Sequence, residues 1–253
     1  MAEELLRHEE VNGVHRLIMN HGPNALDRPL MEELRSAVAR RAEAGAPALV
    51  LASAHPTLFC PGWDLKTLAG ASREKVAEFL SGFNALILEM FSYPGPTAAE
   101  IGGHAVAAGC QMAIACDLRV MAAGRPRLGL SELNLGVPVP GHSLRMLRSR
   151  LSSPAVDDLV FRGEGCTAER AQQLGLAHRV AQPNELTGIT SHELARLAGR
   201  PRTAFVETKK MLLSPVWEEM GQPRPEEDRA FLDCWFESET GERISRMSQR
   251  LGG

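Results

Sequence analysis

The amino-acid sequence predicts an α/β fold followed by a region that is mostly helical. Short apolar runs alternate with amphipathic segments of helical period before Pro140, and helical segments follow one another after it. With 44% hydrophobic and 23% charged residues among 253, the chain has the composition of a globular protein with a sizeable core. The order of the segments alone is compatible with an α/β or an α+β arrangement.

Strands and helices alternate in the first part of the chain. The short runs that predict strands, rich in small and β-branched residues, cover residues 14–19, 48–53, 97–102 and 118–123. Residues 30–45 predict a helix, because apolar residues recur every three or four positions until Gly45 ends the pattern. Residues 72–91 predict a second helix, with Ser72 as its N-cap and the turn sequence YPGP after it.

Helical patterns dominate after Pro140. They cover residues near 142–151, 154–162, 167–174, 184–198, 201–213 and 226–250. A weak boundary lies near residue 198, and the polar stretch GQPRPEED at 221–228 predicts a linker. The sequence therefore predicts that strands come first and helices last, with helices after residue 198 that either pack on the main body or reach away from it.

Charge, apolar runs and cysteines exclude several classes of protein. The net charge of −3 gives no basic surplus for a phosphate backbone, so we expect no nucleic-acid partner. The sequence has neither the pattern of a signal peptide nor an apolar run that approaches a membrane span, so we expect a cytoplasmic protein without a membrane partner. The five cysteines form no CxxC pair and are expected to be buried, reduced thiols.

Three separate stretches contain the residues best suited to chemistry. In LFCPGWDLKTL at 58–68, Pro61 and Gly62 predict a tight turn. In GGHAVAAGCQMAIACD at 102–117, small residues precede a helix that begins near Ala108, whose first N–H groups are free to hold an oxyanion. In LGLSELNLGVPVPG at 128–141, Glu132 lies among apolar residues, where burial raises the pKa of a carboxyl group and makes it a base.

Each of these stretches taken singly also has an ordinary structural interpretation. Glycine turns and small residues at a helix start are mostly packing devices, and a lone glutamate in an apolar run more often faces solvent. Their order along the chain gives them meaning together with further segments. These are PNALDRPLMEEL (23–34), LFCPGWDL (58–65), HAVAAGCQMAIACDLRVM (104–121), LGLSELNLGVPVPG (128–141), TAERAQQLGLAHRV (167–180) and CWFESETGERI (234–244). Over nearly the whole chain, this series resembles the crotonase family of enoyl-CoA hydratases and isomerases.

The resemblance implies a fold, an assembly and a ligand. It implies a spiral of repeated ββα units over residues 1–198 and a C-terminal helical region over 199–253 that is used in trimerisation. Members of the family form trimers that often pair into hexamers, and they bind an acyl-CoA thioester. We accordingly expect a homotrimer or hexamer, and no metal or organic cofactor beyond the CoA of the substrate itself.

The resemblance also assigns the oxyanion hole and the residues around it. The two backbone N–H donors fall on Trp63 and Ala108, and the Trp63 indole is expected to line or shorten the acyl pocket. Pro61 replaces an alanine whose carbonyl faces the adenine of CoA, a contact that proline retains. The remaining residues expected to bind substrate in this loop are Gly62, Asp64, Leu65 and, as a contact for a CoA phosphate, Lys66.

The acids indicate which reaction is expected. Hydratases of the family use two glutamates, and the matching positions here are Gln111 and Glu132. Glutamine holds a water but does not take its proton at neutral pH, so efficient hydration is not expected. Moving a proton from C2 to C4 of a 3-enoyl thioester needs one base, and the strings around both positions are closest to the Δ3,Δ2-enoyl-CoA isomerases. We therefore expect an isomerase in which Glu132 is the base and Gln111 contacts the substrate.

Other interpretations stay open on the sequence alone. Hydration, decarboxylation or thioester hydrolysis would use the same oxyanion hole, and a CoA-binding oligomer without turnover is the alternative outside enzymes. Glu100 is either a second acid that approaches the site or a paired structural residue, the second being expected. His104 and His142 are expected to be packing or pocket-lining residues, because the GxSxG string of a serine hydrolase is absent.

Overall fold

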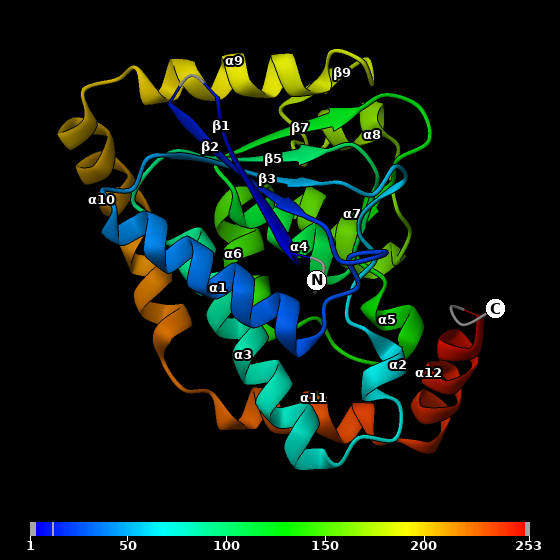
Figure 1. Cartoon of the computed structure of the whole chain (residues 1–253). Coiled ribbons are helices and arrows are strands. Elements are labelled where there is room, and N and C mark those ends of the chain that lie inside the picture. Colours follow the sequence, from blue (N-terminus) through cyan, green and yellow to red (C-terminus); the bar gives the residue numbers. More distant parts are fainter. Residues whose placement is uncertain (1–3, 12, 251–253) are drawn as a thin grey trace.

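A computed structural model describes residues 4–11 and 13–250 and contains a large and a small β-sheet (Figure 1). The large sheet has the strand order β1-β2-β3-β5-β7-β9, and the small one the order β4-β6-β8. The strands are β1 (Leu6–Val11), β2 (Val14–Met19), β3 (Ala48–Ser53), β4 (Leu58–Cys60), β5 (Thr97–Ile101), β6 (His104–Val106), β7 (Leu118–Ala122), β8 (Leu128–Gly129) and β9 (Arg179–Ala181). All neighbouring strands are parallel except β1 and β2, which pair antiparallel.

The chain winds as a spiral in which each turn supplies one strand to each sheet and then a helix. The turns β3-β4, β5-β6 and β7-β8 are followed by helical segments that begin at α2, α4 and α5. The helices are α1 (Arg28–Glu43), α2 (Leu65–Leu68), α3 (Arg73–Phe91), α4 (Ala108–Ala115), α5 (Glu132–Leu135), α6 (Gly141–Arg150), α7 (Ser153–Arg162), α8 (Ala168–Gln173), α9 (Leu186–Ala198), α10 (Arg202–Gly221), α11 (Pro225–Trp235) and α12 (Ser238–Arg250). The expected α/β fold with a spiral of ββα units is confirmed.

Both faces of the large sheet are covered, which explains its apolar strands. Successive side chains of a strand point to opposite faces. In β3, Val50 and its even-numbered neighbours pack with Leu194 of α9, whereas Leu49 and Leu51 belong to the main core. Figure 1 shows α9 lying along the outer face of the sheet and α1 and α3 on the opposite side. A run such as ALVLAS is therefore apolar throughout because neither of its faces meets water.

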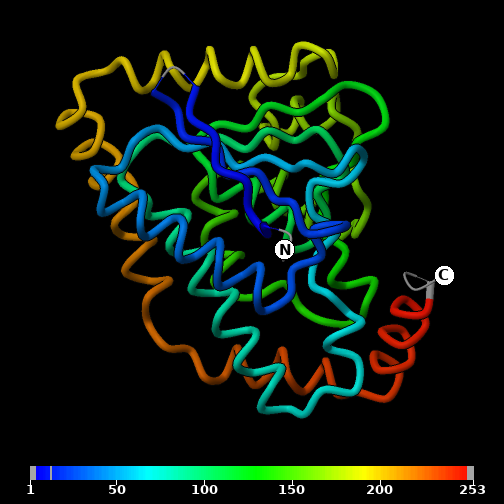
Figure 2. Tube along the Cα trace, in the orientation of Figure 1, coloured from blue at the N-terminus to red at the C-terminus, as the bar shows by residue number. Residues whose placement is uncertain are grey.

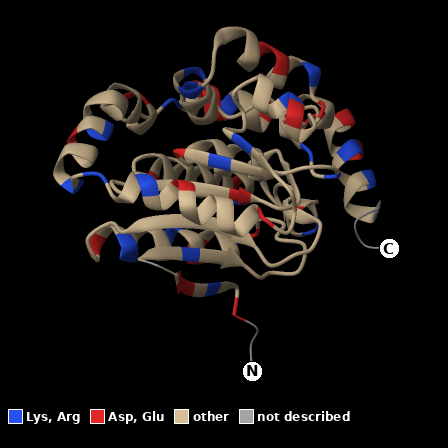
Figure 3. Cartoon of the chain, turned by 90° about the horizontal axis from the view of Figure 1, so that it is seen from above, with Lys and Arg blue, Asp and Glu red and all other residues tan. Residues whose placement is uncertain are grey.

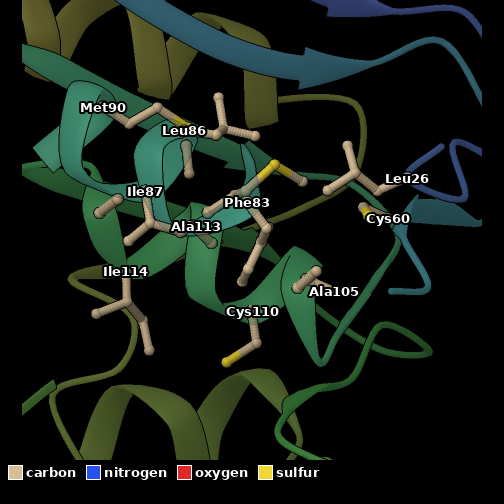
Figure 4. Packing of buried hydrophobic residues seen from close by; sticks show 14 of the residues in the cluster. Leu26, Cys60, Phe83, Leu86, Ile87, Met90, Ala105, Cys110, Ala113 and Ile114 are labelled. Atoms are coloured by element: carbon tan, nitrogen blue, oxygen red, sulfur yellow. The ribbon is translucent and has the colours of Figure 1, made fainter. Parts of the chain in front are cut away.

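The main core lies between the large sheet and helices α1, α3 and α4. In α3, Phe83, Ile87 and other buried residues recur at helical spacing, and Figure 4 shows these side chains beside those of α4. The helix begins as expected at Ser72, whose Oγ accepts a hydrogen bond from the N–H of Lys75. The small residues of α4 are all buried, so this helix lies in the centre of the molecule.

Three expectations for the C-terminal part were wrong in detail. Helix α10 was expected to end at residue 213 but continues through Pro215 to Gly221, because Leu213 and Met220 are buried on either side of the proline. The expected linker 221–228 is shorter, since Pro225 begins α11 and the acidic residues after it lie at the positive end of the helix dipole. The single helix expected at 226–250 is two helices that separate at residues 236–237.

The C-terminal helices pack on the rest of the same chain. Helix α10 contacts α6 and α3, α11 contacts α3, and α12 contacts α2 and α5. Figure 2 follows this segment around the lower side of the molecule back toward α5. Of the two arrangements left open by the sequence, the helices therefore pack on the main body, while the use of 199–253 in trimerisation stays a prediction.

The outer surface carries charges of both signs. Figure 3 shows basic and acidic residues interspersed over the helices and the exposed strand ends. Over residues 4–11 and 13–250, no helix combines the length and the apolar character that crossing a membrane would need.

Candidate active site

A cavity of about 190 Å³ lies where the spiral meets the C-terminal helices. Its walls come from the loop after β4, the start of α4, α5 and the two last helices. The residues that line it are Pro61, Gly62, Trp63, Leu65, Phe83, Ala107, Ala108, Gln111, Ser131, Glu132, Asn134, Leu135, Val137, Pro140, Phe231, Trp235 and Met247. Most of this lining is apolar, so the few polar groups in it determine what it can bind.

In the loop after β4, the backbone N–H of Trp63 points away from Leu26, the residue with which its two neighbours form hydrogen bonds. Gly62 has a φ of +115°, a conformation that glycine adopts without strain. The N–H of Leu26 donates to the Gly62 carbonyl (2.8 Å), and the N–H of Asp64 donates to the Leu26 carbonyl (2.9 Å). This bridge uses the groups on either side of Trp63, so the N–H of Trp63 itself is left without a protein partner among the described residues.

The start of α4 provides a second amide of the same kind. Ala107 has a φ of +49° and a ψ of −116°, an uncommon conformation for a residue with a Cβ. The N–H of Ala107 donates to the Gly129 carbonyl (3.0 Å), and its carbonyl accepts from Gln111 (3.0 Å). The N–H of Ala108, the first residue of the helix, has no such partner in the described chain, and it lies at the positive end of α4.

The small sheet brings these two amides to the same cavity. Strands β4 and β6 are paired neighbours, so the loops that follow them lie side by side. Gly109 allows the close approach, because a Cβ at this position would lie 2.1 Å from the carbonyl oxygen of Cys60. Trp63 and Ala108 both line the cavity, an arrangement that suits two N–H donors directed at one oxygen atom.

Glu132 is a buried carboxylate with one free oxygen. It is the first residue of α5 and is only 7% exposed. Its Oε1 accepts a hydrogen bond from Gln111 Nε2 (2.5 Å), whereas its buried Oε2 has no partner in the described structure. Burial raises the pKa of Glu132 to about 7, and the hydrogen bond from Gln111 counteracts part of that rise. A carboxylate with this pKa exchanges protons near neutral pH.

Gln111 is held at both ends of its amide group. Ser143 Oγ of α6 donates to Gln111 Oε1, while Gln111 Nε2 donates to Glu132, and all three side chains are buried. The serine therefore fixes which end of the amide faces the carboxylate. Gln111 lines the cavity, and its expected contact with substrate stays a prediction. Its hydrogen bond to Oε1 of Glu132 leaves Oε2 as the free oxygen of that carboxylate.

Helix α12 holds the short helix that carries Glu132. Gly136, the C-cap of α5, has a φ of +102°, and a Cβ there would lie 2.4 Å from Thr240 Oγ1. Thr240 Oγ1 donates to the Gly136 carbonyl (3.3 Å), and Arg243 Nη1 donates to the Asn134 carbonyl (3.0 Å). Helix α12 thereby fixes the position of α5 beside the cavity.

Aromatic side chains form the apolar wall. The Trp63 ring packs against Phe79, Phe83, Phe231 and Trp235, with ring centroids 4.9 to 5.7 Å apart. Trp63 thus lies in the wall of the cavity, while its contact with an acyl group stays a prediction. Sequence reasoning missed Phe231, Trp235 and Met247, although Trp235 lies in the segment CWFESETGERI that it had singled out.

The other residues expected to bind substrate divide into two groups. Pro61, Gly62 and Leu65 line the cavity, but Asp64 and Lys66 lie outside its lining. Asp64 Oδ1 accepts from the N–H of Lys66 (2.9 Å) and caps α2, while the Lys66 side chain is exposed. The contact of Lys66 with a CoA phosphate stays a prediction.

Glu100 and the two histidines do not line the cavity. Glu100 lies on the α9 face of β5 and forms a two-pronged ion pair with Arg16 (2.9 and 3.0 Å), and it accepts from Thr187 (2.9 Å). This confirms the paired, structural interpretation. His104 and His142 are half-buried packing residues, and burial lowers the pKa of His142.

The described cysteines are free, and three of the five are buried. Burial raises the pKa of Cys60 and Cys116 to about 12, which keeps these thiols protonated. In residues 4–11 and 13–250, no group of three or more His, Cys, Asp or Glu side chains is placed to hold a metal ion.

A spiral of ββα turns that brings two free backbone amides and one buried carboxylate to an apolar cavity defines a protein of the crotonase class. The sequence model of the enoyl-CoA hydratase/isomerase family matches residues 9–242, and the chain belongs to this family.

Two similar relatives of known name both carry hydratase names. The chain is 32% identical to human mitochondrial methylglutaconyl-CoA hydratase over 180 residues, 70% of this chain and 53% of that protein. It is 32% identical to bovine mitochondrial enoyl-CoA hydratase domain-containing protein 2 over 190 residues, 74% of this chain and 64% of that protein. The chain thus spans about half to two thirds of the length of these relatives.

The fold is also that of solved structures. The structure of human mitochondrial Δ3,Δ2-enoyl-CoA isomerase superposes with a TM-score of 0.93 over 98% of both chains, at 21% identity. At this identity the likeness establishes the fold, and the reaction has to be argued from the site itself.

Proposed function

We propose that the protein is a Δ3,Δ2-enoyl-CoA isomerase in which Glu132 is the single base. The observation that carries this proposal is the free Oε2 of Glu132, which belongs to the one carboxylate among the described residues that line the cavity. A double-bond shift needs one group that removes a proton and returns it elsewhere. Glu132, whose pKa lies at about 7, is suited to both steps.

The proposed mechanism starts with the thioester carbonyl oxygen between the N–H groups of Trp63 and Ala108. Oε2 of Glu132 removes a proton from C2, and the electrons of the broken C–H bond delocalise through the C3–C4 double bond into a dienolate. Each backbone donor stabilises the negative oxygen by about 3 to 4 kcal/mol, judged from single oxyanion donors in other enzymes. Glu132 then returns the proton to C4, which leaves the double bond between C2 and C3 and restores the carboxylate.

Gln111, the hydrogen-bond partner of Glu132, argues against hydration. Adding water across a double bond requires a base for the water as well as a proton donor for the carbon. Gln111 is neutral, and its amide already accepts from Ser143 and donates to Glu132. A glutamine held in this way does not take a proton from water at neutral pH.

Hydration is nevertheless the second candidate, because the named relatives at 32% identity are hydratases or carry a hydratase domain name. In that case Glu132 would act on a water held by Gln111. Decarboxylation or hydrolysis of a thioester would also use the two amides, but the cavity offers no described group that favours either.

The first test is an assay with a 3-enoyl-CoA and, separately, a 2-enoyl-CoA. Isomerisation gives the conjugated thioester absorbance without a change in mass, whereas hydration adds the mass of water. We expect Glu132→Gln, which keeps shape but removes the base, to lower turnover of the 3-enoyl-CoA by about 10²- to 10⁴-fold with binding largely kept.

The matched control is Glu185→Gln, which changes an exposed glutamate outside the cavity and is expected to leave the rate unchanged. Full conjugation activity in Glu132→Gln, or a product heavier by one water, would contradict the proposal. A protein that binds acyl-CoA but turns over neither substrate would indicate the non-catalytic binding role instead.

We also propose that the protein assembles into homotrimers or hexamers, as the family resemblance implies. Sedimentation of the purified protein checks this, and a monomer would contradict it.

A further inference from the structure

The cavity beside Glu132 shares a wall with a second hollow on the molecule. This second hollow, which we call the side groove, has a volume of about 480 Å³ and lies among α3, α6, α7 and α11. Phe231 and Pro140 line both the cavity and the side groove. The two spaces are therefore neighbours, separated by these two side chains.

The side groove is lined by both apolar and charged residues. Apolar residues make up much of it, including Leu80, Val139, Leu144 and Val160. Six of its seventeen lining residues are charged, and among them Arg145 forms ion pairs with Glu219 and Glu227. The apolar side chains can hold a hydrocarbon by removing its surface from water.

The Phe231 side chain forms much of the shared wall. It is 3% exposed, and its ring lies 5.5 Å from that of Trp63 and 6.0 Å from that of Trp235. Pro140 belongs to the backbone turn before α6 and has no side-chain freedom of comparable extent. Whether the cavity ends at this wall or continues into the side groove therefore depends on the side chain at position 231.

We propose that Phe231 determines the acyl-chain specificity of the enzyme by closing the cavity against the side groove. With the phenyl ring in place, the cavity accepts short chains. Removal of the ring joins cavity and groove and admits longer ones. This inference rests on the proposed function. The occupant expected in the groove once the ring is removed is an acyl tail, because the groove shares its wall with the cavity that would hold the thioester.

The test measures kcat/KM for a series of 3-enoyl-CoA substrates lengthened by two carbons at a time. In the wild-type protein we expect kcat/KM to fall once the chain outgrows the cavity. In Phe231→Ala we expect this fall at longer chains, with a relative gain of about fourfold for each methylene newly placed in the groove. Phe231→Leu leaves a smaller hole, is less prone to unfold, and should give a smaller change in the same direction.

A second substitution distinguishes an acyl tail that enters the groove from one that only fills the hole left by the phenyl ring. Leu144→Trp is expected to fill the groove from α6, so in the Phe231→Ala background it should return the chain-length profile toward that of the wild type. The control is Phe236→Ala, a change at an exposed phenylalanine just after α11 that lines neither space and should leave the profile unchanged.

Binding of saturated acyl-CoA thioesters of the same lengths, measured by calorimetry, gives a readout without turnover. Tighter binding of long chains by Phe231→Ala, reversed by Leu144→Trp, supports the proposed role of Phe231 even if the wild-type enzyme catalyses another reaction than isomerisation. An unchanged length dependence in both Phe231 variants, with wild-type isomerase activity present, overturns this inference while the proposed function stands. A gain that Leu144→Trp does not reverse places the tail elsewhere and also overturns it, including the case in which a second copy of the chain covers the groove.

Discussion

At the scale of single residues, Glu132 is subject to two opposed effects. Burial favours the neutral carboxyl group and raises its pKa, while the hydrogen bond from Gln111 favours the carboxylate and lowers it. Burial dominates, so the pKa is about 7 instead of the ordinary 4.5. The sequence alone indicated the carboxylate and its apolar surroundings. It did not indicate Ser143, because the hydrogen bonds that connect Ser143 through Gln111 to Glu132 form only once α4, α5 and α6 are packed together.

The pH dependence of the rate follows from this pKa. The base must be charged to remove a proton, so kcat/KM for the 3-enoyl-CoA is expected to rise with pH through about 7 and then to level off. Gln111→Leu removes the hydrogen bond that lowers the pKa, and we expect the midpoint of its profile to move to higher pH. A midpoint near 4.5 in the wild-type protein, or one that Gln111→Leu leaves in place, would contradict this role of Gln111.

The same pKa has a consequence of opposite sign for stability. The folded protein holds the Glu132 proton more tightly than the unfolded chain does, so the contribution of this group is fully present below about 4.5 and is lost as the pH rises through about 7. The enzyme therefore gains activity over the pH range in which this residue costs it stability.

At the scale of elements, most of the longer segments were predictable from the sequence and the shortest ones were not. Strand β1 has six residues but was not predicted, because five of its side chains are exposed and it shows no apolar run. The predicted strands at 14–19 and 48–53 coincide with β2 and β3. The apolar run of β3 reflects its almost complete burial. The small sheet consists of strands of two or three residues, too short to show any period. The aromatic wall was missed for another reason, since Phe231 and Trp63 are distant in sequence and meet only through packing.

The contact between α4 and the loop after β4 gives a test at this scale. In Gly109→Ala the new Cβ would lie 2.1 Å from the Cys60 carbonyl oxygen, so the start of α4 must move away from β4. We expect a stability loss of about 1–3 kcal/mol. We expect kcat to fall by about 10²- to 10³-fold, because the N–H of Ala108 moves with the helix.

Gly188→Ala is the matched control for Gly109→Ala. Gly188 lies in α9 with no atom within 4 Å of its added Cβ, so this change is expected to stabilise the helix by about 0.5–1 kcal/mol and leave kcat unchanged. Steady-state kinetics and urea denaturation measure both effects. A normal kcat in folded Gly109→Ala would show that the position of α4 does not govern the reaction.

At the scale of the whole molecule, one acid joins the C-terminal helices to the sheet. Asp117, between α4 and β7, accepts from Lys209 of α10 (2.6 Å) and from Arg150 of α6 (3.0 Å). It also accepts from the N–H and the hydroxyl of Thr97 at the start of β5 (both 3.0 Å). Sequence reasoning placed a weak boundary near residue 198 but had no means of finding this connection, because its members come from four separate segments.

Asp117→Asn tests how strongly this connection holds the molecule together. It leaves the buried Lys209 and the partly buried Arg150 without their counter-charge, so we expect a loss of about 3–5 kcal/mol in the free energy of unfolding. Asp157→Asn, at an exposed position, should change it by less than about 0.5 kcal/mol. Urea denaturation followed by circular dichroism measures both, and equal stabilities for the two variants would mean that Lys209 and Arg150 find other partners.

The pairing of β4 with β6 determines more than the path of the chain. Neighbouring strands are spaced about 4.8 Å apart by their backbone hydrogen bonds, whatever side chains they carry. The amides of Trp63 and Ala108 follow these two strands, so their relative position depends on the backbone of the sheet and hardly at all on the residues at positions 63 and 108. Side chains around the cavity can therefore be exchanged while the two amides that we propose as the oxyanion hole stay in place, which makes this scaffold a suitable starting point for directed evolution of substrate range.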